Sequence, residues 1–158
     1  MDLFCFYLPQ YYPFEENSLF WGKGFTEWHN VAKAKPLFKG HDQPKLPGEL
    51  GFYDLRLEKT RNEQRDLLIK HGLKGFIYWH YWFGSDKHVM NEVLDKILFN
   101  DKKTVPFILA WANHNWYKKT WDKSKKDKLL LEVNYNGVND YTRLFYHYLR
   151  AFQDENYY

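Results

Sequence analysis

The sequence contains a single cysteine and no long uninterrupted apolar segment. Cys5 is the only thiol in 158 residues, so no disulfide can form within the chain and nothing requires an oxidising compartment. No apolar run approaches the roughly 20 residues that cross a bilayer. The opening residues MDLFCFYLP place an acid where a secretory signal carries basic residues, and their apolar run is too short for such a signal. We therefore expect a cytoplasmic protein with no direct membrane insertion.

A large charge imbalance and a metal-binding pattern are absent as well. The net charge is +3, and most of the excess lies between Lys118 and Lys128, which we interpret as a solvated loop and not as a phosphate-binding patch. This basic run is separate from the aromatic clusters, which argues against a nucleic acid partner. The seven histidines show no HxxxH or Cys/His spacing, so we expect neither a metal ion nor another cofactor.

Aromatic residues, by contrast, are abundant. They make up 21% of the chain, with seven Trp and 13 Tyr. Because the indole N–H and the phenol hydroxyl need polar partners, so many of them favour a ligand cleft at the surface over a wholly apolar interior. No shift in composition divides the chain, so residues 1–158 are predicted to form one domain.

Hydrophobic patterning predicts strands and helices in alternation. Buried strands are expected at residues 3–8, 75–82 and 106–110, with a short extended segment at 129–133. Helices are expected at residues 55–71, 89–98 and 138–152, the first with Asp54 as its N-cap and with Gly72 left-handed after its end. This order implies an α/β fold with parallel strands and helices packed outside them.

The stretch from residue 9 to residue 53 is too rich in Pro and Gly for a regular element of ordinary length. A loop this long is usually either functional or disordered, and disordered segments contain few aromatic residues. This one contains many, notably in WGKGFTEW at residues 21–28, where Glu27 is the one acid. We predict a long ordered loop after the first strand that helps to build a site.

Each polar and aromatic cluster follows a predicted strand. Ligands of parallel α/β sheets bind beyond the carboxyl ends of the strands, so the clusters are expected to converge on one cleft. In the segment VPFILAWANHNW, Asn113 and His114 lie between Trp111 and Trp116, which suits the hydroxyls and C–H faces of a sugar. The alternative is that both tryptophans are core residues and the asparagines hold a turn.

The number of βα units is small for a closed barrel. Three or four units are about half of a (β/α) barrel, which typically needs about 250 residues. The sequence also stops just after a predicted helix, where another strand would be expected. We interpret the chain as an incomplete domain, either a truncated gene product or a half that pairs with another half.

Four segments together resemble one known family. They are FYLPQYYP at Phe6, the block from Trp21 to Arg56, GFIYWHYWF at Gly75 and WANHNW at Trp111. In this order they resemble the WbsX-type glycosyltransferase family, which is grouped with glycoside hydrolase family 99-like (endo-α-mannosidase-like) TIM barrels. The resemblance implies a partial (β/α) TIM-type barrel and a carbohydrate-active domain of the kind found in lipopolysaccharide O-antigen and other surface-polysaccharide gene clusters.

The resemblance also implies a set of site residues. By position, the lining of the family's sugar cleft falls on Glu27, Trp28, Asn30, His80, Tyr81, Trp82, Trp111, Asn113 and Trp116. We predict Glu27 as the catalytic candidate and the others as substrate-binding residues. His114 is included among the binding residues, although it stands where the family motif WANENW has an acid.

The acid pair of the hydrolase relatives has no counterpart here. Their NEWxEG motif matches nothing in this sequence. Glycosidic cleavage commonly needs two carboxyl groups, and besides Glu27 the acids near the expected face are interpreted as caps and turn residues, namely Asp42, Asp54, Asp86 and Asp122. The chain is therefore predicted to hold the sugar-binding half of a site and to be inactive alone.

Two functions follow from these observations. The first is an enzyme domain that transfers or cleaves glycosyl groups and is active only when its missing half is supplied. The second is a non-catalytic glycan-binding or structural half-barrel. The expected partners are an oligosaccharide or glycosyl donor, together with a second copy of the chain or a complementary C-terminal half, because exposed edge strands promote association.

Overall fold

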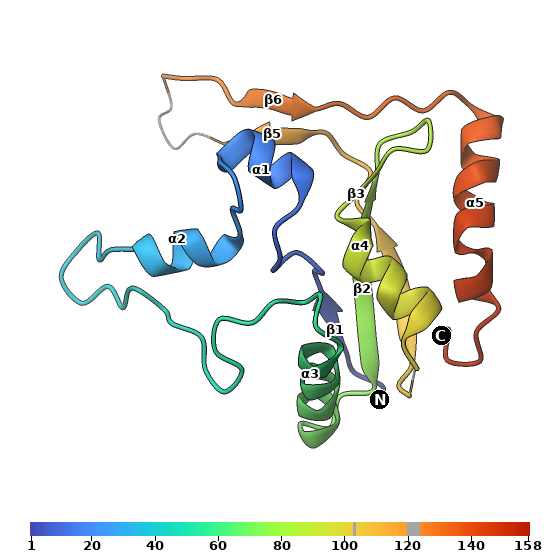
Figure 1. The fold of residues 1–158 in the computed structure, drawn as a ribbon, viewed down its shortest axis with the longest axis horizontal. Coiled ribbons are helices and arrows are strands. Elements are labelled where there is room, and N and C mark those ends of the chain that lie inside the picture. The colour runs from blue at the N-terminus through green and yellow to red at the C-terminus, as the bar shows by residue number, and fades with distance from the viewer. Residues whose placement is uncertain (103, 120–123) are drawn as a thin grey trace.

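The computed structural model describes residues 1–102, 104–119 and 124–158, which adopt a mixed α/β fold (Figure 1). Within these residues the strands are β1 (Phe4–Tyr7), β2 (Gly75–Trp82), β3 (His88–Val89), β4 (Phe107–Trp111), β5 (Trp116–Lys118) and β6 (Lys128–Leu131). The helices are α1 (Glu15–Trp21), α2 (Glu27–Lys33), α3 (Glu58–Lys70), α4 (Asn91–Asp95), the π-helical η1 (Lys96–Asn100) and α5 (Val138–Phe152). The elements predicted at residues 75–82 and 138–152 are confirmed.

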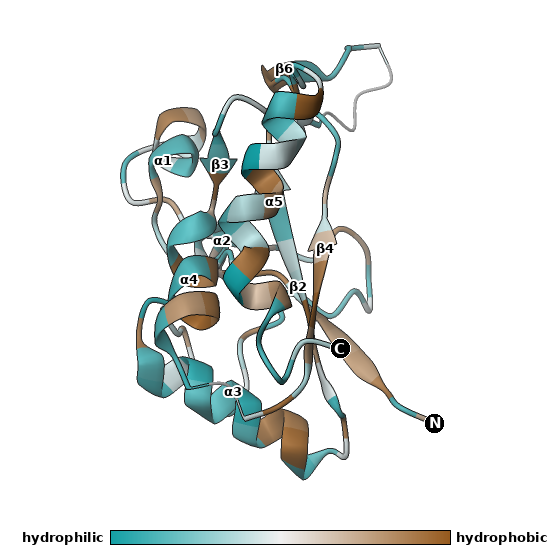
Figure 2. Ribbon diagram, turned by 90° about the vertical axis from the view of Figure 1, so that its right-hand side faces the viewer, coloured by the Kyte–Doolittle hydropathy of each residue, from teal (hydrophilic) through white to brown (hydrophobic). Residues whose placement is uncertain are grey.

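Three parallel strands form the centre of the fold. β2 lies between β1 and β4 and pairs parallel with both, so that Phe76 is opposite Cys5 on one side and Phe107 on the other. α3 connects β1 to β2, and α4 with η1 connects β2 to β4. Figure 2 shows α3 and α4 on the same side of the sheet. The predicted alternation of parallel strands and outer helices is therefore confirmed for these elements.

Alternation along β2 decides which side chains enter the core. Phe76, Tyr78 and Trp82 are buried on the face toward the helices, whereas Ile77 and Trp79 on the other face are only partly buried. The main core joins strand and helix residues, and its buried members are Tyr12, Leu55, Leu68, Phe76, Tyr78, Val93, Leu94, Ile97, Leu98, Phe107, Tyr148 and Ala151. This packing holds the carboxyl ends of β1, β2 and β4 at one end of the molecule.

The stretch from residue 9 to residue 53 contains two helices that the patterning does not predict. α1 and α2 have seven residues each, and Gly22 and Gly24 between them have φ values of +109° and +74°. Glycine adopts positive φ without a steric penalty, so these positions let the chain turn between the helices. The density of Pro and Gly excludes long elements but leaves room for short ones.

α3 begins three residues later than predicted, at Glu58. Asp54 is not its N-cap, because the Asp54 carboxylate accepts hydrogen bonds from the backbone N–H (2.8 Å) and the guanidinium (2.6 Å) of Arg56. The prediction for the end of this helix is confirmed, since Gly72 is left-handed with a φ of +70°.

The helix predicted at residues 89–98 also starts late. Val89 belongs to β3 and pairs with Tyr81 near the end of β2. Met90 then takes a left-handed φ of +59°, which interrupts the backbone before α4 begins at Asn91. The apolar spacing therefore identifies the buried face of this segment but not the strand at its start.

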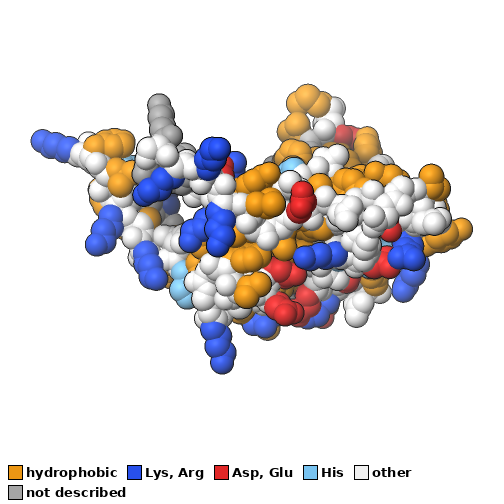
Figure 3. Space-filling model, turned by 90° about the horizontal axis from the view of Figure 1, so that it is seen from above, with side chains coloured by type: hydrophobic (Ala, Val, Ile, Leu, Met, Phe, Trp, Pro, Cys, Tyr) orange, Lys and Arg blue, Asp and Glu red, His pale blue; other side chains and the backbone are white. Residues whose placement is uncertain are grey.

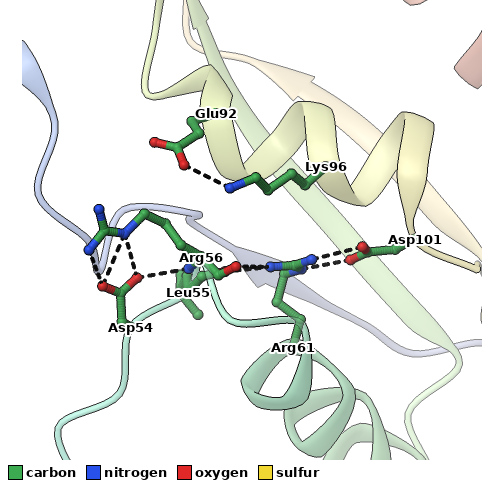
Figure 4. Close-up of polar contacts among 7 residues, drawn as sticks. All are labelled: Asp54, Leu55, Arg56, Arg61, Glu92, Lys96 and Asp101. Carbon is green, nitrogen blue, oxygen red and sulfur yellow. Dashed lines mark hydrogen bonds and ion pairs between the residues drawn. The ribbon is translucent and has the colours of Figure 1, made fainter.

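A buried arginine fastens the start of α3 to the residue that follows η1 (Figure 4). Arg61 donates to Asp101 from Nε (2.6 Å) and from Nη2 (2.7 Å). Its Nη1 donates to the carbonyl oxygens of Leu55 (2.8 Å) and Arg56 (2.9 Å). Hydrogen bonds to a carboxylate and to two carbonyl oxygens stabilise the positive charge of the buried guanidinium. The contact also fixes the end of the long loop against the helical layer.

Beyond β4 the chain forms the antiparallel hairpin of β5 and β6. The extended segment predicted at residues 129–133 overlaps β6, whereas β5 is not predicted, because no strand pattern was recognised after Trp116. Part of the basic run lies in this hairpin, and its residues 120–123, including the predicted turn residue Asp122, lie outside the described residues. None of the described helices is long and apolar enough to cross a membrane.

The residues after α5 pair with the outer edge of β4. The N–H of Phe107 donates to the carbonyl oxygen of Asn156, and the N–H of Tyr158 donates to the carbonyl oxygen of Phe107, both at 2.9 Å. These bonds form a parallel bridge between Phe107 and Tyr157. The segment therefore runs in the same direction as β4.

Candidate functional site

An open cleft of about 730 Å³ lies beyond the carboxyl ends of the three parallel strands. Gln10 follows β1, Tyr81 is near the end of β2, and His114 and Trp116 follow β4. The rest of the lining comes from α1 and from the hairpin that closes one side, namely Asn17, Trp21, Asn115, Tyr117, Lys119 and Leu130. Of the predicted site residues, the structure brings Tyr81, His114 and Trp116 together here.

Trp116 is the aromatic centre of the cleft. Its ring packs edge to face with those of Tyr81 (centroids 4.9 Å apart) and Phe83 (5.9 Å). Trp21 also lines the cleft and is exposed, with the Nζ of Lys118 4.8 Å from its ring centre. Figure 3 views the molecule from the side of this hairpin and shows Lys and Arg side chains interspersed with exposed hydrophobic groups. The cleft therefore offers flat apolar surfaces beside charged and polar groups.

A small polar cluster lies at the wall formed by Gln10 and α1. Glu27 accepts hydrogen bonds at Oε1 from the Nε2 of Gln10 and from the Nδ2 of Asn17, the second at 3.2 Å. Its other oxygen, Oε2, is buried and has no partner among the described residues. Burial of this carboxyl raises the pKa of Glu27, against the hydrogen bonds that lower it.

The local sequence explains how these three residues meet. The N–H of Gln10 donates to the carbonyl oxygen of Leu8 (2.8 Å), so the chain turns sharply after β1. The turn at Gly22 and Gly24 then folds α2 back toward α1, which places the first residue of α2, Glu27, beside the buried Asn17. The polar cluster therefore depends on the glycine spacing in WGKGFTEW.

Asn115 has a structural role at the edge of the cleft. Its Oδ1 accepts a hydrogen bond from the N–H of Val133 (2.8 Å), and its Nδ2 donates to the hydroxyl of Tyr117 (3.3 Å). It thereby ties the hairpin together, as the turn interpretation of this segment anticipates. The neighbouring Asn113, predicted as a binding residue, is exposed and does not line the cleft.

Trp28 and Asn30 lie apart from the cleft on α2. The indole Nε1 of Trp28 donates to the carbonyl oxygen of Tyr53 (2.8 Å), and its ring packs against Tyr11 with centroids 4.5 Å apart. Trp28 thus holds α2 against the end of the long loop. It lines a different surface pocket, together with Pro47 and residues of α3. Asn30 is exposed beside a shallow pocket on the outer side of α2.

His80, Trp82 and Trp111 lie on the face of the sheet that is covered by helices. Trp82 is 1% exposed and stacks on Tyr135, with centroids 5.2 Å apart. Trp111 and His80 line a separate apolar groove of about 340 Å³ against α5. The structure does not bring these three into the cleft, because neighbouring residues of a strand point to opposite faces and Tyr81 takes the cleft side.

His80 is buried and neutral in character. Its Nδ1 lies 3.2 Å from the hydroxyl of Tyr148 on α5. Burial, with His88 and His147 nearby, lowers the pKa of His80 to about 4. A neutral buried histidine can either donate or accept this hydrogen bond. His80 therefore helps to hold α5 against the sheet.

The remaining predicted acids form ion pairs or lie outside the described residues. Asp42 pairs with Lys45 (3.2 Å), Asp54 pairs with Arg56, and Asp86, in a turn with a φ of +61°, pairs with Arg143 (3.1 Å). None of them lines the cleft. Within residues 1–102, 104–119 and 124–158 there is also no group of three His, Cys, Asp or Glu side chains placed to hold a metal ion.

Seven of the described lining residues were not predicted as site residues. Four belong to the segment around the hairpin, namely Asn115, Tyr117, Lys119 and Leu130, and three come from the first part of the chain, namely Gln10, Asn17 and Trp21. Gln10 directly follows a strand in FYLPQYYP, so the rule that ligands bind beyond strand ends was a signal for it. Asn17 and Trp21 belong to α1, and no helix was predicted there. For these two, the sequence carried no signal beyond the aromatic content of the loop.

Comparisons with known proteins agree on one family. The model of the family described as Glycosyltransferase WbsX matches residues 3–158. Two relatives from Xanthomonas campestris pv. campestris, strains B100 and ATCC 33913, each called an uncharacterized protein WxcX, are 44% identical over 128 residues. That match covers 81% of this chain and 18% of each relative, so the chain spans less than a fifth of their length. No solved structure matches the chain.

The family match extends over the whole fold and includes every residue that lines the cleft. The 44% identity also covers four fifths of the chain. Both observations agree with the motifs read from the sequence. The chain belongs to the WbsX glycosyltransferase family.

Proposed function

We propose that this chain is the saccharide-binding part of a carbohydrate-active domain that acts on glycosidic bonds in surface-polysaccharide metabolism, of the lipopolysaccharide O-antigen type. The observation that carries the proposal is the cleft beyond β1, β2 and β4, where Trp116 and Tyr81 lie beside the amides of Gln10 and Asn17. Membership of the WbsX family supports the ligand class.

The chemistry of the cleft suits a sugar ring. The C–H face of a pyranose packs on an indole or phenol ring, while its hydroxyls need both donors and acceptors around the rim. Trp21, Trp116 and Tyr81 supply the rings, and Gln10, Asn17 and His114 supply the polar groups. A volume of about 730 Å³ lies within the range of roughly 300–1,000 Å³ that is usual for small-ligand sites.

Turnover is proposed to need residues from a complementary C-terminal half. Glycosidic cleavage through two carboxyl groups requires an acid together with a base or nucleophile. No carboxylate side chain is among the described lining residues, and Glu27 lies behind Gln10 and Asn17. The catalytic role of Glu27 stays a prediction. The much greater length of the WxcX relatives supports a division of labour between binding and catalytic segments.

We further propose that the parallel strands are the first part of a (β/α) barrel. The support is the order of strands and helices and the pairing of residues 156–158 with β4 in the direction that a fourth strand would take. In such a barrel the cleft described above would lie on the face where ligands bind.

The alternative function is a non-catalytic glycan-binding or structural module, and the carboxylate-free lining of the cleft favours it. Turnover separates the two. The purified chain is incubated with activated sugars and oligosaccharides, alone and with the remainder of a WxcX relative added. Turnover only in the mixture supports the enzyme domain, whereas saccharide binding without turnover in either sample supports the module.

A first test of the cleft itself uses three neutral probes: the methyl glycosides of α-D-mannose, α-D-glucose and α-L-rhamnose. Titration into ¹⁵N-labelled chain is followed through the indole N–H signals of Trp21 and Trp116. A shift of both indole signals with at least one probe is expected. Unchanged signals with all three would contradict saccharide binding at this cleft.

A further inference from the structure

Glu27 is placed behind the wall of the cleft and reaches it only through two amides. Its Oε1 accepts from both Gln10 and Asn17, and both of these side chains line the cleft, whereas Glu27 does not. Its Oε2 is buried without a partner in the described part of the chain. A ligand in the cleft would therefore meet Gln10 and Asn17 first.

A carboxylate determines whether a neighbouring side-chain amide turns its NH₂ group or its carbonyl oxygen toward it. Asn and Gln side chains carry a donor NH₂ and an acceptor oxygen of nearly the same shape, and they can turn to suit their surroundings. An ionised carboxylate only accepts hydrogen bonds, so both NH₂ groups must face Glu27. Among the described residues neither amide oxygen accepts a hydrogen bond, and neither is a buried unpaired atom. The two oxygens are left for the cleft.

We infer that Glu27 is a positioning residue that holds the amides of Gln10 and Asn17 with their carbonyl oxygens toward the cleft, where they accept hydrogen bonds from neighbouring hydroxyls of a saccharide. This inference rests on the proposed function and deepens it. A wall of two acceptor oxygens favours a hydroxyl-rich edge of a sugar and disfavours a carboxylate or phosphate at the same place, because those groups bring no hydrogen to donate.

The acceptor oxygen of Glu27, and not its charge, is what the arrangement needs. Glu27→Gln keeps a carbonyl oxygen of the same shape, so the amides keep one acceptor to face. Glu27→Met removes every acceptor while retaining similar volume, so both NH₂ groups lose their partner and turn toward the cleft. Since burial raises the pKa of Glu27, its charge opposes folding, and Glu27→Gln is not expected to lower the melting temperature.

The test measures Kd by ¹H–¹⁵N NMR, with whichever of the three methyl glycosides binds the native chain most tightly. We expect Glu27→Gln to bind within about threefold of the native Kd and Glu27→Met at least about tenfold more weakly. The side-chain NH₂ signals of Gln10 and Asn17 should move in both variants before any sugar is added. Glu15→Gln, which removes an exposed acid at the start of α1, is the matched control and should leave the Kd unchanged.

A double-mutant cycle separates positioning from simple support of the fold. If Glu27 acts through Gln10, Glu27→Met should weaken binding less in a Gln10→Met background than in the native chain. Additive effects, or native affinity in Glu27→Met, would overturn the inference. So would equal weakening in Glu27→Gln and Glu27→Met. If Glu27→Met does not fold, unchanged NH₂ signals in the isosteric Glu27→Gln would overturn it instead.

The result that would contradict the proposed function differs from those that would overturn the positioning role of Glu27. It is the lack of any response to all three probes in the native chain. Native binding that survives loss of the Glu27 acceptor overturns only the positioning role and leaves the saccharide cleft in place.

Discussion

At the scale of single residues, Arg61 has more structural consequence than any exposed ion pair. Its side chain is 7% exposed, and it binds Asp101 in a bidentate manner as well as two backbone carbonyl oxygens of the loop before α3. Removing one partner of a buried pair leaves the other charge without compensation, which typically costs about 3–5 kcal/mol. Exposed pairs such as Arg56 with Asp54 are worth about 0–1 kcal/mol.

Arg61→Ala is therefore predicted to lower the free energy of unfolding by about 3 kcal/mol or more. The measurement is urea unfolding at neutral pH, followed by circular dichroism. Arg56→Ala, which removes an exposed guanidinium two residues from Asp54, is the control and should change the same quantity by about 1 kcal/mol or less. Equal losses in the two variants would mean that the buried contacts of Arg61 stabilise the fold no more than an exposed ion pair does.

The sequence predicted which segments reach the cleft, but not which residues within a strand face it. The rule that ligands bind beyond strand ends predicted a common location for Tyr81, His114 and Trp116, and the structure places these three at one cleft. It could not separate Tyr81 from His80 and Trp82, because a run of aromatic residues hides the two-residue alternation that sends them to opposite faces. Trp28 and Trp82 lie at separate places because each has a packing partner that the sequence does not reveal.

At the scale of elements, a group of histidines joins the strands to α5. His80 on β2 lies against Tyr148, and the rings of His88 on β3 and His147 on α5 are 4.2 Å apart. His147 Nε2 is 3.4 Å from Oδ1 of Asp95 on α4. Burial is the main cause that lowers the pKa of both His80 and His88 to about 4, although Asp95 and Asp86 oppose this at His88.

These lowered pKa values predict a loss of stability in mild acid. Between pH 6.5 and pH 4 the unfolded chain binds more protons than the folded chain, because each histidine titrates near 6.5 when unfolded and near 4 when folded. The contribution of these two neutral histidines to the free energy of unfolding is complete above pH 6.5 and is lost as the pH falls toward 4. Going from pH 7.5 to pH 5.5 should lower the free energy of unfolding by about 1 kcal/mol for each histidine.

The measurement is urea unfolding across this pH range for the native chain, His88→Gln and the exposed control His71→Gln. His88→Gln should flatten the dependence on pH, while His71→Gln should leave it unchanged. A native chain equally stable at pH 7.5 and pH 5.5 would refute the prediction.

Elements with strong periodicity were predicted well, and short ones were not. β2 is a continuous aromatic and β-branched run, and α5 places apolar residues at three-and-four spacing, so both could be predicted from the sequence. α1, α2 and β5 have seven residues or fewer, and their formation depends on tertiary packing rather than on pattern. The start of α3 was displaced because Asp54 binds Arg56 and not a helix terminus.

At the scale of the whole molecule, one face of the parallel sheet is open. Phe6 on β1 is 69% exposed, and its ring packs edge to face with that of Trp79 on β2, with centroids 5.8 Å apart. Within the described residues, the outer edge of β1 has no strand partner, and the outer edge of β4 pairs only at Phe107. Exposed apolar faces and unpaired edges promote association.

We therefore expect the isolated chain to self-associate through the open face. Sedimentation velocity over a series of concentrations should show species heavier than a monomer, and Phe6→Ser should shift the distribution toward the monomer. Leu37→Ser removes an even more exposed apolar side chain (84%) from the long loop and should have no such effect. A native chain that stays monomeric at every concentration would contradict the expectation.

Family and topology could be predicted together because they rest on different properties of the sequence, the identity of the motif residues and the order of the strands and helices. The motifs that identify the WbsX family are spread over the whole chain, and the alternation of strands and helices gives parallel pairing independently of them. The polar wall of the cleft could not be predicted, since Asn17 and Glu27 meet only after two glycines reverse the chain.

The most direct test of the central claim is the affinity of the chain for the methyl glycoside that binds it best, compared between the native chain, Trp116→Ala and Trp111→Ala. Trp116 lines the cleft beyond the strand ends, while Trp111 lines the separate groove against α5. Trp116→Ala is expected to weaken binding at least about tenfold, a loss of about 1.4 kcal/mol, and Trp111→Ala to change it by less than about twofold. Full affinity in Trp116→Ala, or loss of binding in Trp111→Ala alone, would mean that the saccharide binds elsewhere and not at the cleft beyond the strand ends.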